Sequence, residues 1–482
     1  MECLYLERYE KKNSKKKPKG YYEETIASII TPPGEGGIGA IRISGKSSNQ
    51  IIKKIFRPSG QDLSIFKPFV MYYGSIKDSK GNVIDEVTTV SMPAGKSYTG
   101  QDQAEIFCHG GQFVLKQILQ EIFRHDVRPA EPGEFTRRAF LAGRIDLTKA
   151  EAVADLIASR TEYSYRSARD NLLGELSQYI GNLRDKAVQL MAEIEAAIDY
   201  PEENLEIAEK ENLLKSAEYL ISNIKDLIDS YRSGKIIREG YKIAIAGRPN
   251  AGKSSLFNLL LNQSRAIVTP TPGTTRDYLT EWVELSGMAV SLTDTAGFRK
   301  PDSAIERSGQ VFAEREMKKA DLVIWMVDIS KKNWKSALES DLKKINRFKN
   351  VLIVLNKTDL VNRNKTRDIS IIIKSLNIHT LFLSCKTKAG FKLLINGLND
   401  SINENMPDLT DQLVVTSERH KRKLAGSLKY LKNVHRGILN NISPELIAFD
   451  IRQAVDEIDE ITGRVYTEEI LDSIFSRFCI GK

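Results

Sequence analysis

The residues best suited to chemistry stand near the middle of the chain, in the segment GRPNAGKS at 247–254. Its G-x-x-x-x-G-K-S spacing is typical of a phosphate-binding loop, in which glycines let backbone N–H groups turn toward phosphate oxygens. Lys253 would add a positive charge at the outer phosphates, and the Ser254 hydroxyl is a ligand for Mg²⁺. An apolar run precedes the loop and a helical pattern follows it, which is the context such a loop requires. The sequence therefore predicts phosphate contacts from Asn250, Ala251, Gly252, Lys253, Ser254 and Ser255.

Four further stretches follow in the order and spacing of a guanine-nucleotide domain. In a polar loop at 271–277, Thr275 offers a second protein ligand to Mg²⁺. Asp294 ends a strand pattern and is placed to hold the water shell of the metal, while the Gly297 amide would sense the γ-phosphate. Asp359 would accept hydrogen bonds from guanine, which adenine cannot donate. The predicted ligand is GTP, contacted by Thr269, Thr271, Gly273, Thr274, Thr275, Asp294, Thr295, Ala296, Gly297, Asn356, Lys357, Thr358, Asp359, Ser384, Cys385 and Lys386.

Phe298 occupies the position at which Ras-like enzymes carry the glutamine that orients the attacking water. A phenyl ring cannot orient water, so either GTP is hardly hydrolysed or other groups contact the water and stabilise the developing charge. Glu306 is the candidate for the water, with a solvated surface carboxylate as the alternative. The side-chain oxygen of Asn250, with backbone carbonyls of the loop 269–274, would hold a monovalent cation in place of an arginine.

Composition excludes several other classes of protein. The 482 residues carry 71 basic and 63 acidic side chains, for a net charge of +8. About half of this excess lies in residues 1–20, which we expect to be a solvated, disordered tail. The four cysteines contain no C-x-x-C pair, which argues against a disulfide framework or a zinc site and favours a reducing cytoplasm. No apolar run approaches the roughly 20 residues of a membrane span.

The patterns along the chain predict a multidomain protein of the α/β plus α class. After the tail we expect an α/β domain at 21–142, a helical domain in two parts at 143–235 and 403–482, and a Ras-like P-loop domain inserted at 236–402. Strand patterns stand at 25–30, 38–43 and 86–92, and a helical pattern at 112–124. The segment GEGGIG at 34–39 matches a dinucleotide fingerprint, but a strand pattern follows it, so a turn is the better interpretation.

The chain resembles the family of tRNA modification GTPases called MnmE or TrmE, over nearly all residues after the tail. Besides the GTP motifs, the resemblance rests on TPPGEGGIG at 31–39, SYTG at 97–100, EIFCHGG at 105–111, PGEFTRRAF at 132–140 and FCIGK at 478–482. It implies an N-terminal domain that dimerises and binds 5,10-methylene-tetrahydrofolate or its 5-formyl analogue. Carried over by position, the folate contacts would be Arg42, Glu105, Arg144 and Lys482.

The resemblance also implies a reaction. In this family GTP hydrolysis depends on potassium-promoted dimerisation of the G domains, with the cation near Asn250, Thr269, Thr271 and Thr274 and the water positioned by Glu306. With the flavoprotein MnmG (GidA), which carries the FAD, the family forms a heterotetramer. The complex adds a (carboxymethyl)aminomethyl group to C5 of the wobble uridine of certain tRNAs. The alternative is a ribosome-assembly switch of the Era or Der type, but no KH-like module or second G domain is visible.

Three further features admit two interpretations each. Cys479 is either a nucleophile for uridine C6 or a buried cysteine that packs beside the last helix. His109, between glycines, is a structural or folate-pocket donor rather than a general base. A basic helical face would hold tRNA phosphates or would simply be solvated; it comprises Arg419, Lys421, Arg422, Lys423, Lys429, Lys432 and Arg436.

Overall fold

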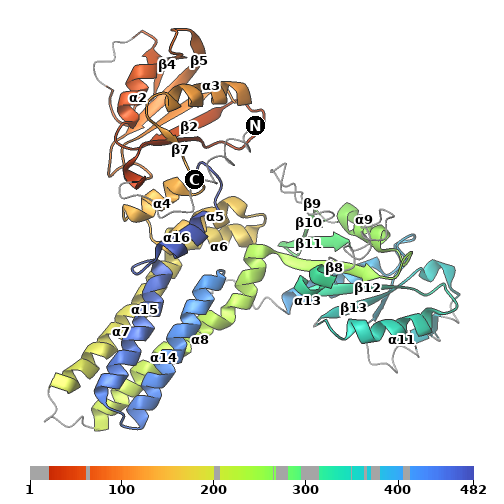
Figure 1. Ribbon diagram of the computed structural model, residues 1–482. Helices are drawn as coiled ribbons and strands as arrows, with labels where there is room; N and C mark the ends of the chain where they lie inside the picture. Colours follow the sequence, from red (N-terminus) through yellow and green to blue (C-terminus); the bar gives the residue numbers. More distant parts are fainter. Residues whose placement is uncertain are drawn as a thin grey trace. The chain divides into compact units, whose positions relative to one another are not determined.

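The computed structural model describes residues 21–60, 66–199, 207–263, 265–266, 280–294, 314–348, 350–362, 366–367, 369–370, 380–404 and 413–482 (Figure 1). The predicted basic tail at 1–20 lies outside these residues. The chain divides into two compact units, one formed by 1–154 with 459–482 and the other by 155–458. Both α/β and purely helical parts are present, so the predicted fold class is confirmed. None of the described helices is long and apolar enough to cross a membrane.

The first unit is built on a seven-stranded sheet in the order β3-β4-β5-β6-β2-β1-β7. All its neighbouring strands are antiparallel except β1 and β7. β2 begins at Gly39, the last residue of the glycine-rich segment, so a strand and not a helix follows the turn, as the interpretation of that segment requires. The elements are η1 (Tyr21–Glu23), β1 (Ile26–Ile29), β2 (Gly39–Ser44), α2 (Ser48–Ile55), β3 (Phe56–Pro58), β4 (Tyr72–Lys77), β5 (Val83–Met92), β6 (Gln103–Cys108), α3 (Gln112–Phe123), β7 (Arg128–Pro129) and α4 (Glu134–Leu141).

Strand alternation decides which face of this sheet is free for a site. Ile41 and Ile43 of β2 and Ile106 of β6 point into the core with the apolar residues of α2 and α3. Because side chains alternate along a strand, Arg42 and Glu105 must then lie on the opposite face. The two residues are direct partners in the antiparallel register of β2 and β6.

The end of the chain returns to the first unit through a small apolar cluster. Phe140 and Leu147 pack with Leu471, Phe475 and Phe478, which brings α4 and α5 (Leu147–Ala158) against α16 (Glu468–Phe475). Backbone contacts extend this packing to the last residues of the chain. Gly133, at φ 67°, donates its N–H to the Cys479 carbonyl at 3.4 Å, and Phe135 donates to the Lys482 backbone oxygen at 3.1 Å.

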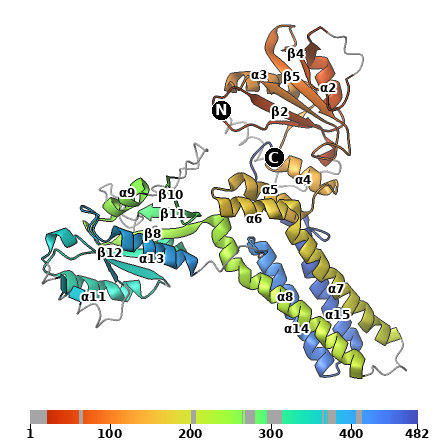
Figure 2. The same cartoon turned by 180° about the vertical axis from the view of Figure 1, so that it is seen from behind.

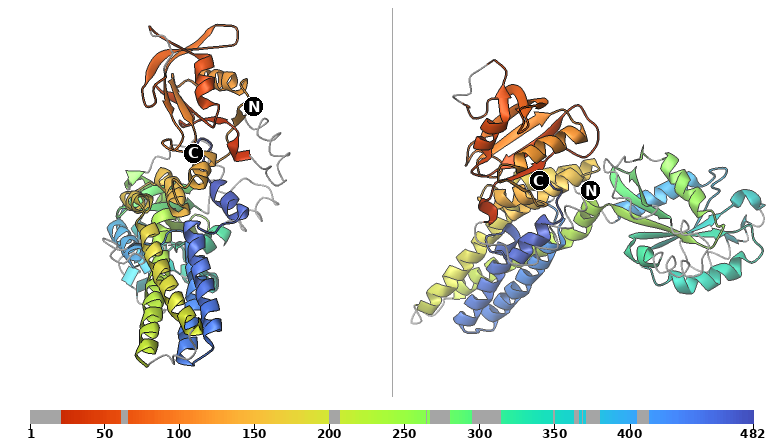
Figure 3. Two further views of the ribbon diagram at one scale, coloured as in Figure 1. Left: turned by 90° about the vertical axis from the view of Figure 1, so that its left-hand side faces the viewer. Right: turned by 45° about the horizontal axis from the view of Figure 1, so that its top comes forward.

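The helical part of the second unit contains four long helices that lie side by side (Figures 2 and 3), namely α7 (Glu175–Asp199), α8 (Ile207–Glu239), α14 (Glu418–Leu439) and α15 (Pro444–Thr462). The shorter α6 (Glu162–Leu173) runs across one end of them (Figure 2). Gly174, at φ 103°, ends α6, so the apolar periodicity from 172 to 198 is divided between two helices. α8 continues past residue 235, and Ile236 and Ile237 join the core of the α/β part.

The α/β part of the second unit has a seven-stranded sheet in the order β14-β13-β12-β8-β11-β10-β9. The first five strands are parallel, so functional side chains are expected at their carboxyl ends. One apolar cluster packs the sheet against α9 and α13, and another against α11. The elements are β8 (Tyr241–Gly247), α9 (Lys253–Gln263), β9 (Arg265–Ala266), β10 (Thr280–Leu285), β11 (Met288–Asp294), β12 (Leu322–Asp328), α11 (Trp334–Ile345), β13 (Val351–Asn356), η2 (Thr358–Leu360), β14 (Thr380–Phe382) and α13 (Phe391–Asn403).

Candidate GTP site and N-terminal cluster

The phosphate loop lies between β8 and α9, where the sequence predicts it. Lys253 donates from its ammonium to the carbonyls of Gly247 at 2.9 Å and Arg248 at 3.0 Å. These contacts hold the ammonium over the loop, the position from which it would reach phosphate oxygens. Asn250 has a left-handed backbone with φ 63°, which asparagine tolerates better than most residues. The local geometry is therefore that of a loop prepared to bind an anion.

Two candidate metal-binding groups meet at the start of α9. The Ser254 hydroxyl donates to Asp294 Oδ2 at 2.9 Å, although the two residues belong to different strand–loop connections. Asp294 is 4% exposed and ends β11, so the parallel sheet brings it beside the phosphate loop that follows β8. A hydroxyl and a carboxylate oxygen at this distance suit the oxygen ligands and bound water that Mg²⁺ prefers.

Asn356 joins the phosphate loop to the predicted base pocket. Its amide nitrogen donates to the Ala251 carbonyl at 2.8 Å, and its amide oxygen accepts from the Cys385 N–H at 3.2 Å. Gly252 approaches so closely that a Cβ there would lie 2.1 Å from Asn356 Nδ2. The close approach explains why a glycine is needed at this position, in addition to its φ of 102°.

The remaining base-pocket residues are held by ion pairs and hydrogen bonds. Ser384 donates its hydroxyl to Asp359 Oδ1 at 2.6 Å, which leaves the other carboxylate oxygen available to guanine. Lys357 donates to Asp328 Oδ2 at 2.7 Å. Burial raises the pKa of Asp328, but hydrogen bonds from Lys357 and Ser330 outweigh burial and lower it overall. Asp328 ends β12 and stays charged. It therefore holds Lys357 in place, close in the chain to Asp359, which is predicted to contact the guanine base.

Several predicted GTP and cation contacts lie outside the described residues. They are Thr269, Thr271, Gly273, Thr274, Thr275, Thr295, Ala296, Gly297 and Glu306, together with Phe298. The structure brings together Asn250 to Ser255, Asp294, Asn356 to Asp359 and Ser384 to Lys386, because all of these follow the carboxyl ends of parallel strands.

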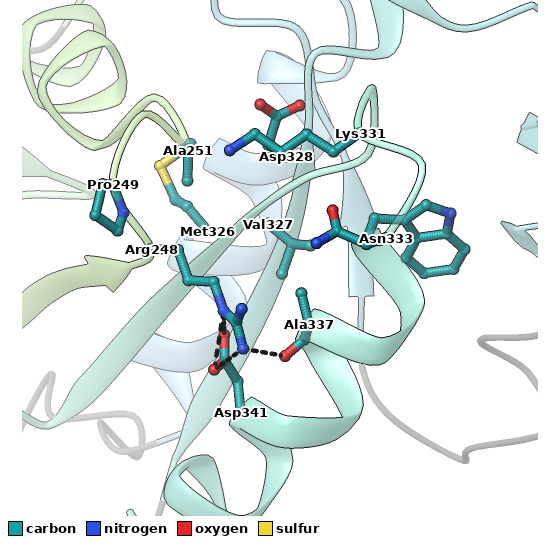
Figure 4. A pocket seen from close by; sticks show the side chains of 11 residues that line it. Arg248, Pro249, Ala251, Met326, Val327, Asp328, Lys331, Asn333, Ala337 and Asp341 are labelled. Carbon is teal, nitrogen blue, oxygen red and sulfur yellow. Dashed lines mark hydrogen bonds and ion pairs between the residues drawn. The ribbon is translucent and has the colours of Figure 1, made fainter.

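A cavity of about 70 Å³ lies beside the phosphate loop, against α11 (Figure 4). Across it the Arg248 guanidinium reaches Asp341, with Nη2 2.9 Å from Oδ1 and Nε 3.0 Å from Oδ2. Asp341 is 5% exposed and also accepts from the indole nitrogen of Trp325 at 3.3 Å. Neither Lys253 nor Asp359 lines this cavity. The Arg248–Asp341 pair was not predicted from the sequence, because the phosphate-loop motif assigns no role to its second residue.

A second group of predicted residues gathers in the first unit. Arg42 donates from Nε to Glu105 Oε1 at 2.8 Å, and Gln103 donates to the same oxygen at 3.1 Å. The Arg42 guanidinium lies 5.2 Å from the ring centroid of Tyr98 and 5.5 Å from that of Phe135. Tyr98, Phe135 and Gln103 were not singled out from the sequence as contacts. Both rings and the Gln103 amide therefore lie beside the Arg42–Glu105 ion pair. We call Arg42, Tyr98, Gln103, Glu105 and Phe135 the N-terminal cluster.

Lys482 and Arg144, the other predicted folate residues, come from different segments of the same unit. Burial lowers the pKa of Lys482 and the charge of Arg42 lowers it further, while Cys479 and Glu105 act in the opposite direction. The Lys482 backbone oxygen accepts from the N–H of Phe135, whose ring lies against Arg42, so Lys482 lies beside the N-terminal cluster. Arg144 donates to the Gly95 carbonyl at 2.7 Å, at the edge of the loop that leads to Tyr98.

Cys479 is exposed, so the alternative of a buried structural cysteine is wrong. His109 is also exposed and donates or accepts through Nδ1 with Asp85 at 2.7 Å, while its backbone N–H donates to the same carboxylate at 2.8 Å. Asp85 thus contacts both the ring and the backbone of His109, and the expected role of His109 as a structural or folate-pocket donor stays a prediction.

Comparison with known proteins covers almost the whole chain. The family model described as "MnmE helical domain" matches residues 147–479, and "GTP-binding protein TrmE N-terminus" matches 25–144. The tRNA modification GTPase MnmE of Natranaerobius thermophilus is 42% identical over 461 residues, which is 95% of this chain and all of that one. The MnmE of Syntrophus aciditrophicus is 41% identical over 463 residues, with 95% and 100% of the two chains covered.

Fold and site define a P-loop GTP-binding protein that carries a separate α/β domain and a long helical part. The chain belongs to the MnmE family of tRNA modification GTPases. It is accordingly a GTP-binding enzyme that hydrolyses GTP. The match at 25–144 does not favour a ribosome-assembly switch of the Era or Der type. The solved structure of Era in complex with a segment of 16S ribosomal RNA is similar to this chain at 24% sequence identity and a TM-score of 0.29. The match covers 39% of this chain and 66% of the Era chain.

Proposed function

We propose that the chain uses GTP hydrolysis to drive modification of the wobble uridine of certain tRNAs, together with an FAD-carrying partner of the MnmG type. The relatives named tRNA modification GTPase support the tRNA substrate. The single structural observation that carries the proposal is the position of the segment 479–482, with the exposed Cys479, beside the Arg42–Glu105 pair. Phe135 donates its N–H to the Lys482 backbone oxygen, and its ring lies 5.5 Å from the Arg42 guanidinium. A GTPase switch alone has no need of such an arrangement.

The proposed ligand of the N-terminal cluster is a tetrahydrofolate that carries a one-carbon unit. A folate combines a flat, hydrogen-bonding pteridine with a carboxylate tail, and the residues of this unit offer groups that match both. Tyr98 and Phe135 supply aromatic faces, Glu105 accepts from ring N–H groups, and Lys482 and Arg144 supply positive charge for the tail.

In the proposed chemistry, the Cys479 thiolate adds to C6 of the uridine. The S–C6 bond forms as the C5–C6 π electrons move toward C5 and O4, which makes C5 nucleophilic toward the one-carbon unit. Loss of the C5 proton then restores the double bond and expels the thiolate. Glycine or ammonium would then displace tetrahydrofolate from the methylene carbon, so the new C–N bond forms as the bond from that carbon to the folate nitrogen breaks. The flavin of the partner would supply any oxidation or reduction of the one-carbon unit.

The test is a reconstituted reaction with unmodified tRNA, the flavoprotein and the folate, followed by mass analysis of the wobble uridine. Cys479→Ser should abolish the modification while GTP turnover is retained. Arg42→Ala should lower it and should also weaken folate binding measured directly. Full modification by Cys479→Ser would remove the nucleophile from the mechanism, and unmodified uridine with the wild-type chain would overturn the proposed function itself.

The proposed GTPase cycle uses Mg²⁺ at Ser254 and Thr275, potassium at Asn250 with Thr269, Thr271 and Thr274, and Glu306 for the water. The contact of Ser254 with Asp294 and the backbone of Asn250 support the part of this arrangement that lies within the described residues. A homodimer through the N-terminal domain, with G domains juxtaposed during turnover, completes the proposal.

A further inference from the structure

α14 (Glu418–Leu439) presents two sharply different faces. Its buried face consists of His420, Leu424, Ser427, Leu431, Val434, Gly437 and Ile438. At 100° per residue, the exposed Arg422, Lys429 and Arg436 fall within about 40° of one another on the opposite side. Lys432, also exposed, lies next to this row. We call Arg422, Lys429, Lys432 and Arg436 the cationic stripe.

The basic residues on the flanks of α14 have partners within the second unit. Lys423 forms an ion pair with Glu457 at 3.1 Å, on the flank toward α15. Toward α8, Lys421 lies 4.6 Å from the ring centroid of Tyr231, and His435 meets Glu218 at 3.2 Å. Glu457, Tyr231 and Glu218 therefore contact the side chains on the flanks of α14 and not the four residues of the cationic stripe.

The four stripe residues have no carboxylate partner among the residues that the structure describes. Arg436 donates only to the Lys432 carbonyl and to Asn433, and Lys429 lies 5.8 Å from the ring of the adjacent Tyr430. The one acidic residue of the helix is Glu418, in its first turn. Without counter-charges, the positive side chains of the stripe repel one another, which costs electrostatic free energy. A bound polyanion would remove this repulsion.

The spacing of the stripe fits an extended anion. Fourteen residues separate Arg422 from Arg436, which corresponds to about 21 Å of straight helix. No large hydrophobic side chain is exposed between these two residues. Protein interfaces are enriched in exposed aromatic and apolar groups at their centres, whereas phosphate contacts require only lysine and arginine. The stripe therefore matches a phosphodiester backbone better than a protein surface.

We propose that the cationic stripe of α14 binds the phosphate backbone of the tRNA substrate. The inference rests on the proposed function for the identity of the nucleic acid. The contacts carry no sequence information, so they would orient the tRNA on the helical part and leave base recognition to other groups. Cys479, Arg42 and the GTP site take no part in them.

The test uses the full chain with all four stripe residues changed to glutamate (R422E, K429E, K432E and R436E). A matched control changes four exposed lysines of other helices to glutamate (K215E, K225E, K343E and K392E), so the net charge is altered equally. Binding of unmodified tRNA is followed by fluorescence anisotropy over a series of KCl concentrations. GTP turnover without tRNA, measured in parallel, should be unchanged in both variants.

The stripe variant should bind tRNA at least about tenfold more weakly near 0.1 M salt, and the slope of log K against log salt should fall by about 3. The control should stay within about twofold of the wild type. Equal losses in the two variants, or wild-type affinity and slope in the stripe variant, would overturn the proposal. Retained tRNA binding with lost association of the flavoprotein would reassign the stripe to a protein partner. If the wild-type chain itself binds no tRNA, the proposed function fails as well.

Discussion

Arg248 of the phosphate loop and Asp341 of α11 are joined by three hydrogen bonds of 2.9 to 3.2 Å. The carboxylate is buried and the guanidinium is half exposed, with 7% and 47% of their side-chain surfaces accessible. The backbone carbonyl of Arg248 accepts from Lys253, so the pair connects α11 to the lysine that would contact phosphate. The pair thereby holds the loop in place from outside the nucleotide site.

We predict that Arg248→Ala weakens GTP binding and lowers the free energy of unfolding by about 1–2 kcal/mol, since Asp341 loses its charged partner. Lys335→Ala on the same helix is the control, because its ion pair with Glu339 is exposed and long at 4.0 Å. A double-mutant cycle with Asp341→Ala checks the coupling. Additive effects of the two changes would show that the pair does not act as a unit.

A second prediction concerns Gly252. Its replacement by alanine would place a Cβ 2.1 Å from Asn356 Nδ2 at a φ of 102°, so Asn356 must move and lose its bonds to Ala251 and Cys385. Gly252→Ala should therefore weaken binding of a fluorescent GTP analogue by at least about tenfold. Gly181→Ala on α7 is the matched control, because that glycine has open space around it. Comparable affinities in the two variants would contradict the bridging role of Asn356.

The GTP site could be predicted largely because its motifs follow strand ends. Buried apolar runs define β8, β11 and β13, and a parallel sheet brings whatever follows them to one edge. The contact of Ser254 with Asp294 is a direct consequence. The sequence could not show that the Asn356 side-chain amide donates to the Ala251 carbonyl. This hydrogen bond joins residues 105 positions apart, and it forms only because the phosphate loop comes close to the end of β13.

Other features depended on packing that a sequence pattern does not encode. The apolar periodicity passes through Gly174 without interruption, and only the backbone at φ 103° shows that a helix ends there. Likewise, the pairing of Arg42 with Glu105 is fixed by the register of β2 and β6, and strand patterns alone do not define a register. The resemblance to a family supplied those positions, whereas Tyr98 and Phe135 emerged only from the fold.

A third prediction follows from Phe298 and Asn250. GTP turnover should be much faster in potassium than in sodium buffer of equal ionic strength, because a monovalent cation would replace the charge of an arginine. Asn250→Gly keeps the backbone at φ 63° accessible but removes the side-chain oxygen, so it should lose the potassium stimulation and retain GTP affinity. Equal wild-type rates in the two salts would exclude the cation site.

Glu306→Ala should leave GTP affinity intact and slow hydrolysis by about 10²-fold or more, as expected for loss of a group that orients water. Glu314→Ala serves as the control, since that carboxylate forms an exposed ion pair with Lys318 at 3.0 Å. Single-turnover measurements separate binding from the chemical step. Unchanged turnover in Glu306→Ala would return this residue to a surface role.

The last prediction concerns acid sensitivity of the N-terminal unit. Glu134 is 1% exposed and accepts from Arg128 at 2.6 and 2.7 Å and from Arg138 at 2.8 Å. Burial raises its pKa, but the hydrogen bonds and charges of the two arginines outweigh burial and hold the pKa below the ordinary 4.5. The charged form is thus favoured by folding. Its contribution to stability is complete above pH 4.5 and is lost as the pH falls through the lowered pKa.

Glu134→Gln should therefore destabilise the protein at neutral pH by about 3–5 kcal/mol, because the buried Arg138 loses the carboxylate that it contacts and Arg128 keeps only its ion pair with the more exposed Glu24. The difference from the wild type should shrink as the pH is lowered below 4.5, where the wild-type carboxylate also becomes protonated. Thermal unfolding measured over a pH series checks both expectations. Glu162→Gln, whose ion pair with Arg166 is exposed, should change stability by less than about 0.5 kcal/mol. A difference between wild type and Glu134→Gln that stays constant down to pH values well below 4.5 would show that the carboxylate charge is not what stabilises this cluster.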